Sequence, residues 1–229
     1  MKKSDFVFLC IVLFIFTPFF LFPDLYKMYQ QLNTNHGMCT SFFKFAILST
    51  LGELLGLRIS SGHYLQKGFG ILPRALVWGI FGIGINMAFI IFSNGVLSLA
   101  SYMGVNHPTD IMNSSFTFEK LLLAFTISVI LNSIFAPIFM TLHKITDTHI
   151  LATGGTLHGF FSPIPIGNIL QHLNWKVQWN FVFKKTIPLF WYPAHTITFL
   201  LPEELRVLFA ALLGVALGII LAIAARKNH

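Results

Sequence analysis

Long apolar runs alternate with short polar segments along this chain. Runs of about 18 or more apolar residues are long enough to cross the hydrocarbon core of a bilayer as helices. The pattern predicts an all-α, polytopic transmembrane helical bundle of five to six spans, so that residues 1–229 form a single integral membrane domain. The predicted spans are 6–22, 42–59, 75–101, 120–142, 181–201 and 205–225.

One further segment, 150–173, is moderately apolar but repeatedly interrupted. Gly154-Gly155, Pro163 and Pro165 all oppose a continuous helix. Irregular backbone is tolerated at membrane depth only where protein or water surrounds it. We therefore expect a broken, re-entrant or interfacial segment here.

The first apolar run follows Lys2-Lys3 and has two interpretations, a retained span or a cleaved signal peptide. It is longer than the apolar core of most signal peptides and contains Pro18. No small-x-small cleavage site follows it. The retained span is the favoured interpretation.

Composition agrees with a membrane protein, because 55% of the residues are hydrophobic and only 10% are charged. Soluble domains carry roughly 25% charged residues. The net charge of +7 does not indicate nucleic-acid binding, because the basic residues stand singly or in pairs at the ends of apolar runs. Cys10 and Cys39 form no disulfide framework or Cys-x-x-Cys motif.

The Lys and Arg residues indicate an orientation. With six spans, eleven of them fall on one side of the membrane and four on the other. The positive-inside rule then places both termini in the cytoplasm. The basic start without an Arg- and Ser-rich transit segment favours a bacterial cytoplasmic membrane, with an organelle inner membrane as the alternative.

Pairs of small residues mark faces on which helices can approach one another closely. These faces are candidates for packing within the bundle and for homo-oligomer formation. They are Gly52 with Gly56, Gly79 with Gly82, and Gly214 with Gly218.

Four polar residues from different spans, Glu53, Asn86, Asn132 and His195, fall near mid-membrane. With a rise of about 1.5 Å per residue, they occupy one slab roughly 10 Å deep. Such groups cost on the order of 2.5–3.5 kcal/mol in lipid when charged and should therefore turn inward. They predict either a polar lumen, which Thr198 would join, or hydrogen bonds that hold the bundle together. For the two asparagines we favour the structural role.

Glu53 is the strongest candidate for a functional group, because it is an acid deep within a span. We expect it to be protonated or paired, with His195 or Arg58 as partner. His143, Asp147 and His149 lie close in sequence, but their spacing matches no metal signature. We therefore predict no metal site and no cofactor.

Enzyme motifs are missing from the sequence. It contains no Gly-x-Ser-x-Gly, no His-Glu-x-x-His and no phosphate-binding glycine loop. We predict that the protein is not an enzyme. An intramembrane enzyme using Glu53 and His195 as base and acid remains an alternative, as does a proton-coupled carrier.

The segment from Trp191 to Arg206 resembles the closing signature of the Mpv/PMP family of organelle membrane proteins. The matching positions are Trp191, Pro193, Phe199, Pro202 and Arg206, with His195 near the family's glutamine and Thr198 at its asparagine. The resemblance covers about 175–226. It implies an all-helical membrane protein that acts as a channel for small solutes.

These observations predict a channel or permeation pathway for small solutes in a lipid bilayer. Glu53, Asn86, Asn132, His195 and Thr198 would line its polar zone. The main alternative is a membrane scaffold or assembly protein that transports nothing.

Overall fold

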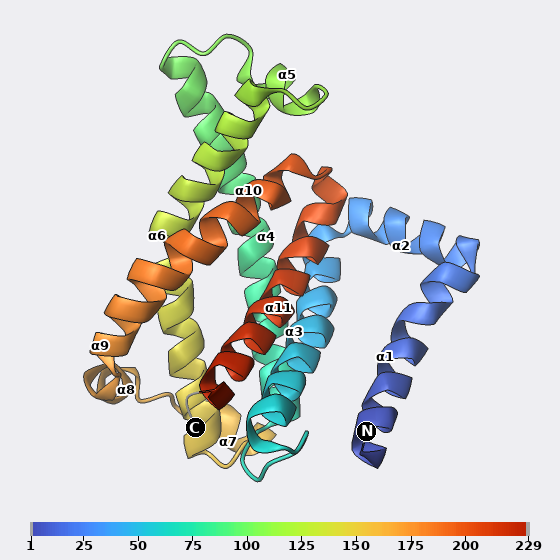
Figure 1. The fold of residues 1–229 in the computed structure, drawn as a ribbon, viewed down its shortest axis with the longest axis vertical. Helices are drawn as coiled ribbons and strands as arrows, with labels where there is room; N and C mark the ends of the chain where they lie inside the picture. Colours follow the sequence, from blue (N-terminus) through green and yellow to red (C-terminus); the bar gives the residue numbers. More distant parts are fainter. Residues whose placement is uncertain (1, 228–229) are drawn as a thin grey trace.

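The computed structural model describes residues 2–227, and all its regular elements in that range are helices (Figure 1). In chain order they are α1 (Lys3–Leu21), α2 (Pro23–Asn35), α3 (Gly37–Ser61), α4 (Ile71–Tyr102), α5 (Pro108–Asn113), α6 (Phe118–Ala152), α7 (Leu157–Phe160), α8 (Ile166–His172), α9 (Trp175–Val177), the π-helix η1 (Gln178–Trp191), α10 (Tyr192–Leu200) and α11 (Glu203–Lys227).

Three of the described helices, α1, α4 and α6, are long and apolar enough to cross a membrane. The chain is thus an all-α membrane protein. The other predicted spans correspond to α3, to η1 with α10, and to α11. Of these, α3 carries Lys44, Glu53 and Arg58, which lower its apolar character.

The bundle is organised around α3, which packs against α4 on one side and α11 on the other. α6 packs against α4 and α10, so that α10 and α11 close the bundle (Figure 1). Apolar side chains from all five helices meet in one core. Its most deeply buried members include Phe45, Ile127, Leu131, Phe199 and Ala211.

Glycines bring these helices close together. A Cβ added to Gly82 on α4 would lie 2.5 Å from the backbone oxygen of Ser41 on α3, a distance no real side chain tolerates. Further along α3, a Cβ at Gly52 would lie 3.0 Å from Val215 on α11. The prediction of small-residue packing is confirmed at both contacts. It is wrong for Gly214, where an added Cβ meets no atom within 4 Å.

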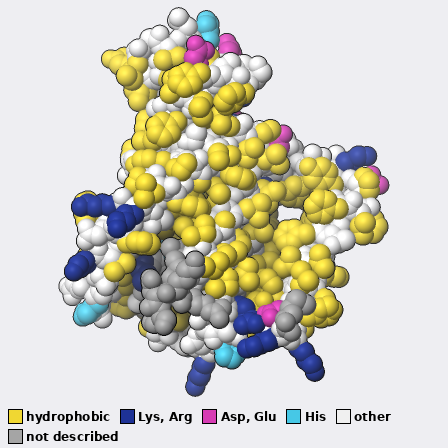
Figure 2. All heavy atoms as spheres, viewed as in Figure 1, with side chains coloured by type: hydrophobic (Ala, Val, Ile, Leu, Met, Phe, Trp, Pro, Cys, Tyr) yellow, Lys and Arg dark blue, Asp and Glu magenta, His cyan; other side chains and the backbone are white. Residues whose placement is uncertain are grey.

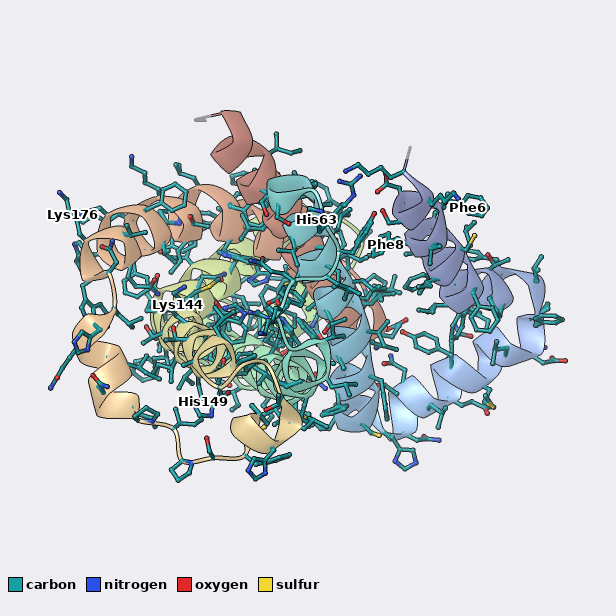
Figure 3. The ribbon with its side chains drawn as sticks, turned by 90° about the horizontal axis from the view of Figure 1, so that it is seen from below. Phe6, Phe8, His63, Lys144, His149 and Lys176 are labelled. Carbon is teal, nitrogen blue, oxygen red and sulfur yellow. The ribbon has the colours of Figure 1, made fainter. Side chains whose placement is uncertain are left out.

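α1 and α2 form an arm beside the bundle (Figure 1). Over its described length α1 has no buried residue. The Arg58 guanidinium binds the Asp5 carboxylate at 2.6 and 2.9 Å and so joins α1 to α3. Figure 3 shows Phe6 on the outer side of α1 and Phe8 on the side towards the bundle, where it stacks on Tyr64 at 4.7 Å.

The segment 150–173 is broken in the structure. α6 continues to Ala152, two left-handed glycines follow, and α7 and α8 are short. Gly155 packs against the loop before α4, because a Cβ there would lie 2.6 Å from the oxygen of Gly68 and the nitrogen of Gly70. This contact holds the segment against the end of the bundle from which α4 starts.

The chain re-enters the bundle through an unusual helix. η1 is wound as a π-helix, and the Tyr192 N–H that follows it still donates to the carbonyl five residues earlier, at Ile187. Pro188 and Pro193 each remove a backbone donor from this stretch. Ser128 on α6 donates its hydroxyl to the Tyr192 carbonyl at 2.7 Å and so ties η1 and α10 to α6.

Candidate functional site

A cavity of about 300 Å³ lies inside the bundle, between α3, α4, α6, η1, α10 and α11. We call it the central cavity. Three of the residues expected in a polar zone, Glu53, Asn132 and His195, line it. They come from α3, α6 and α10, so the helix faces predicted to turn away from lipid do meet here.

Glu53 lies at one end of the central cavity in a group that we call the charged cluster, formed by Glu53, Arg74, His143 and Asp147. Its Oε2 accepts from Arg74 Nη1 at 2.6 Å. Its Oε1 accepts from Trp78 Nε1 at 2.8 Å and lies 3.3 Å from His143 Nε2. Both carboxylate oxygens are therefore occupied by neighbouring side chains.

Arg74 is the centre of the charged cluster. Only 7% of this residue is exposed, and its guanidinium bridges Glu53 on α3 and Asp147 on α6. Its Nε also donates to the carbonyl of Phe69 at 2.7 Å. A charge-assisted hydrogen bond to Glu53, an ion pair with Asp147 and a hydrogen bond to a carbonyl hold the planar group from three directions.

The predicted partners of Glu53, Arg58 and His195, are both wrong. Arg58 is five residues from Glu53 on the same helix, on another face, and binds Asp5 instead. His195 lines the same cavity but bonds to Asn132. The true partner, Arg74, lies just before the predicted third span of 75–101, whereas α4 begins at Ile71 and carries Arg74 on its first turn.

Asn132 and His195 form a second polar group, the amide–imidazole pair. His195 Nδ1 lies 3.1 Å from Asn132 Oδ1. The Asn132 amide nitrogen donates to the Ser128 carbonyl at 2.8 Å, which leaves Oδ1 as the acceptor. His195 therefore carries its proton on Nδ1, and in the neutral ring Nε2 is an acceptor.

Two further residues that line the central cavity each carry a buried polar atom that has no hydrogen-bond partner among the described residues. They are the Ser49 hydroxyl on α3 and the Trp191 indole N–H at the end of η1. Ser49 is 4% exposed and Trp191 is 9% exposed. Buried polar groups are normally paired, so these two atoms require an explanation.

A second cavity, of about 420 Å³, lies between the α2–α3 junction, α4 and the α10–α11 turn. We call it the outer cavity. Its lining is rich in amides, hydroxyls and charged groups, and includes Asn33, Asn86, Ser93, Asn94, Glu204 and Arg206. Asn86 thus belongs to the outer cavity and not to the central one, because it lies on another face of α4.

Phe89 lines both the central and the outer cavity. It is 5% exposed and packs edge-on against His195, with ring centroids 5.4 Å apart. At the other end, a space of about 10 Å³ lies among Glu53, Arg74, His143 and Asp147. The central cavity is therefore bounded by an aromatic ring at one end and by the charged cluster at the other.

Residues of the family signature pack in the core or cap the end of a helix. Phe199 is 1% exposed in the core, and Pro202 precedes α11. Arg206 donates to the carbonyls of Leu201 at 3.1 Å and Phe199 at 3.4 Å, which caps the end of α10. Thr198 is fully buried and donates to the Ala194 carbonyl of its own helix at 3.0 Å, so it lines neither cavity.

Sequence reasoning missed four residues of the site: Arg74, Trp78, Phe89 and Ser49. The available signal for Arg74 was its position directly before a long apolar run, but the same position suits an interfacial anchor. Phe89 and Ser49 are indistinguishable from core residues in the sequence. Among the described residues, no three His, Cys, Asp or Glu side chains are grouped as metal ligands.

Comparisons with models of known protein families, with curated protein sequences and with solved structures found no match to this chain. The resemblance to the Mpv/PMP family therefore stays a prediction from its residues. The two cavities are the features that bear on function.

Proposed function

We propose that the protein is a passive pathway for small solutes across a membrane and that the structure represents its closed state. The observation that carries the proposal is the serial arrangement of the two cavities, which share Phe89 as a wall. The outer cavity, Phe89, the central cavity and the charged cluster would follow one another along the path. Movement of one aromatic ring and of one ion-paired group would then connect the two ends.

We further propose six crossings, in which α3, the unit of η1 with α10, and α11 join the three apolar helices. α3 and α11 each have 25 residues, or roughly 37 Å at about 1.5 Å per residue, which is enough to span a bilayer. The charged residues near the middle of α3 have partners inside the protein, since Glu53 binds Arg74 and Lys44 bonds to Asn33. This arrangement satisfies the requirement that charges avoid lipid.

The distribution of charge supports an orientation with both described chain ends on the cytoplasmic side. α1 begins and α11 ends at the same end of the molecule (Figure 1). Lys and Arg side chains gather towards this end, as Figure 2 shows. By the positive-inside rule this end faces the cytoplasm, and we propose the cytoplasmic membrane of a bacterium as the location.

The geometry favours a pathway over an intramembrane enzyme. General acid–base chemistry would need free positions on Glu53 and His195 within reach of one substrate. Both oxygens of Glu53 are engaged by Arg74, Trp78 and His143. A scaffold protein is the second candidate, but the two adjoining cavities have no role in it.

The test shortens Phe89, the residue that lines both cavities. In proteoliposomes, Phe89→Ala should increase the permeability to glycerol and propane-1,2-diol several-fold over wild type, measured by stopped-flow light scattering. Phe135→Ala is the matched control, because Phe135 lines the central cavity but not the outer one. Phe89→Leu removes less volume and should give a permeability between those of wild type and Phe89→Ala. A graded response of this kind separates the opening of the pathway from simple unfolding.

Two results would count against the pathway. One is a permeability of folded Phe89→Ala liposomes equal to that of protein-free liposomes. The other is an equal increase for Phe135→Ala, which would indicate general loosening of the bundle. Either result would favour the scaffold.

A further inference from the structure

We propose that the central cavity binds a small, uncharged, mostly apolar molecule that carries one hydrogen-bonding group. The inference does not depend on the proposed function, because binding does not require this molecule to be the solute of the pathway. Three features of the cavity support binding: its apolar walls, the unpartnered polar atoms of its lining residues and its lack of free charge.

The walls of the central cavity are largely apolar. Phe45, Ile85, Leu131, Phe135, Phe139 and Met140 are among the side chains that form them. The volume of about 300 Å³ is about twice that of an engineered apolar cavity that binds benzene. Pockets of this size that bind small molecules are mostly apolar, with a few placed polar groups. A molecule with a bicyclic or short-chain apolar body matches the space.

Three lining residues carry a polar atom without a partner among the described residues, and two of these atoms, on Ser49 and Trp191, are buried just behind the cavity wall. The Trp191 N–H is a donor, His195 Nε2 is an acceptor, and the Ser49 hydroxyl is both. Trp191 and His195 are neighbours, with ring centroids 5.0 Å apart. We place the hydroxyl of the ligand beside these two rings, where a turn of the Trp191 ring towards the cavity would let the hydroxyl accept from the indole N–H and donate to His195 Nε2.

Charged molecules do not match the central cavity. Among the described residues that line it, Glu53 is the only one of the Asp, Glu, Lys and Arg types. Its two oxygens already bind Arg74, Trp78 and His143, and Arg74 is shared with Asp147. An ionised ligand would lose its hydration without gaining a free counter-charge.

The experiment compares three probes with the same ring system: 1-naphthol, naphthalene and 1-naphthalenesulfonate. Binding to the full chain in nanodiscs is measured by equilibrium dialysis, with empty nanodiscs correcting for partition into lipid. We expect saturable binding of one 1-naphthol per protein. Naphthalene should bind about 3- to 10-fold more weakly, since one hydrogen bond contributes a modest net free energy. The sulfonate should show no saturable binding.

Two variants locate the site. Gly214 lines the central cavity and an added Cβ there meets no atom within 4 Å, so Gly214→Leu should fill the cavity without disturbing the fold and abolish binding. Gly84 on α4 is equally open but lines neither cavity, so Gly84→Leu is the matched control and should bind as wild type does. Trp191→Phe should weaken 1-naphthol binding about 3- to 10-fold and leave naphthalene binding unchanged.

The inference is overturned if 1-naphthol binds no better than naphthalene, if the sulfonate binds as tightly, or if Gly214→Leu binds as wild type does. These outcomes are independent of permeability. Binding as expected in a protein that transports nothing would support this inference and overturn the proposed function. If permeability responds to Phe89→Ala but no saturable binding is found, the proposed function is supported and this inference is overturned.

Discussion

The charged cluster and the amide–imidazole pair lie at the same cavity but are built in different ways. In the cluster, Arg74 joins two carboxylates from different helices, and three donors surround Glu53. In the pair, one hydrogen bond of 3.1 Å joins Asn132 and His195. Both oxygens of Glu53 in the cluster are occupied, whereas His195 Nε2 in the pair has no partner among the described residues.

The difference shows that polar groups at membrane depth serve two purposes. A charge must be compensated completely, because an unpaired one is very costly away from water. A neutral group costs less and can stay partly open, so it remains available to a ligand. On this view the cluster holds the bundle closed at one end, and the pair together with Trp191 and Ser49 provides the binding surface.

The largest effect should follow from breaking the cluster. Arg74→Met keeps roughly the length of the side chain but leaves Glu53 without its arginine and Asp147 with only Lys144, at 3.8 Å. We expect a loss of about 3–5 kcal/mol in the free energy of unfolding, the usual result of removing one partner of a buried pair. The measurement is unfolding in mixed micelles by titration with a denaturing detergent, followed by circular dichroism.

Arg58→Met is the matched control for this prediction. It also removes an arginine that binds a carboxylate, but its partner Asp5 belongs to α1, which buries none of its described residues. It should destabilise the bundle much less than Arg74→Met does. Equal losses would show that the cluster is no more important than the attachment of the arm.

The sequence predicted the helices better than it predicted their faces. Every predicted span coincides with a described helix or helical unit, because long apolar runs admit no other structure in lipid. The depth of Glu53, Asn132 and His195 was also informative, since all three reach one cavity. Depth does not fix rotation about the helix axis, however. For that reason Asn86, at the same depth on α4, lies in the outer cavity.

The partners of Glu53 could not be predicted for a related reason. Arg74 precedes an apolar run, and in a sequence such a residue is equally suited to the lipid interface. Its burial depends on α3, α4 and α6 meeting at that end, which is a tertiary property. Phe89 could not be predicted at all, because a phenylalanine in the core and one that separates two cavities have the same sequence pattern around them.

A smaller effect should follow from breaking the pair. Asn132→Leu removes the acceptor of His195 Nδ1 and should cost about 1–2 kcal/mol, the range for leaving a buried donor unsatisfied. Combined with His195→Leu, it forms a double-mutant cycle that isolates the bond. We expect a coupling of about 0.6 kcal/mol, the average for hydrogen bonds between membrane helices.

The cycle is measured by the same detergent titration as for Arg74→Met. A coupling as large as the whole loss for Arg74→Met would remove the contrast between the two groups. A coupling near zero would mean that the pair is held by the packing of Phe89 and Trp191 around the imidazole and not by its hydrogen bond.

The smallest effect should come from the amide that lies outside the central cavity. Asn86 is half-buried, and its amide nitrogen lies 3.5 Å from the sulfur of Met38, a weak acceptor. Asn86→Leu therefore removes little and should change the free energy of unfolding by no more than about 0.5 kcal/mol. It should also leave 1-naphthol binding unchanged, because Asn86 does not line the central cavity. If Asn86→Leu lowered the free energy of unfolding by more than about 1 kcal/mol, every amide at this depth would hold the bundle equally. The distinction between paired charges and partly unpaired neutral groups would then have no energetic basis.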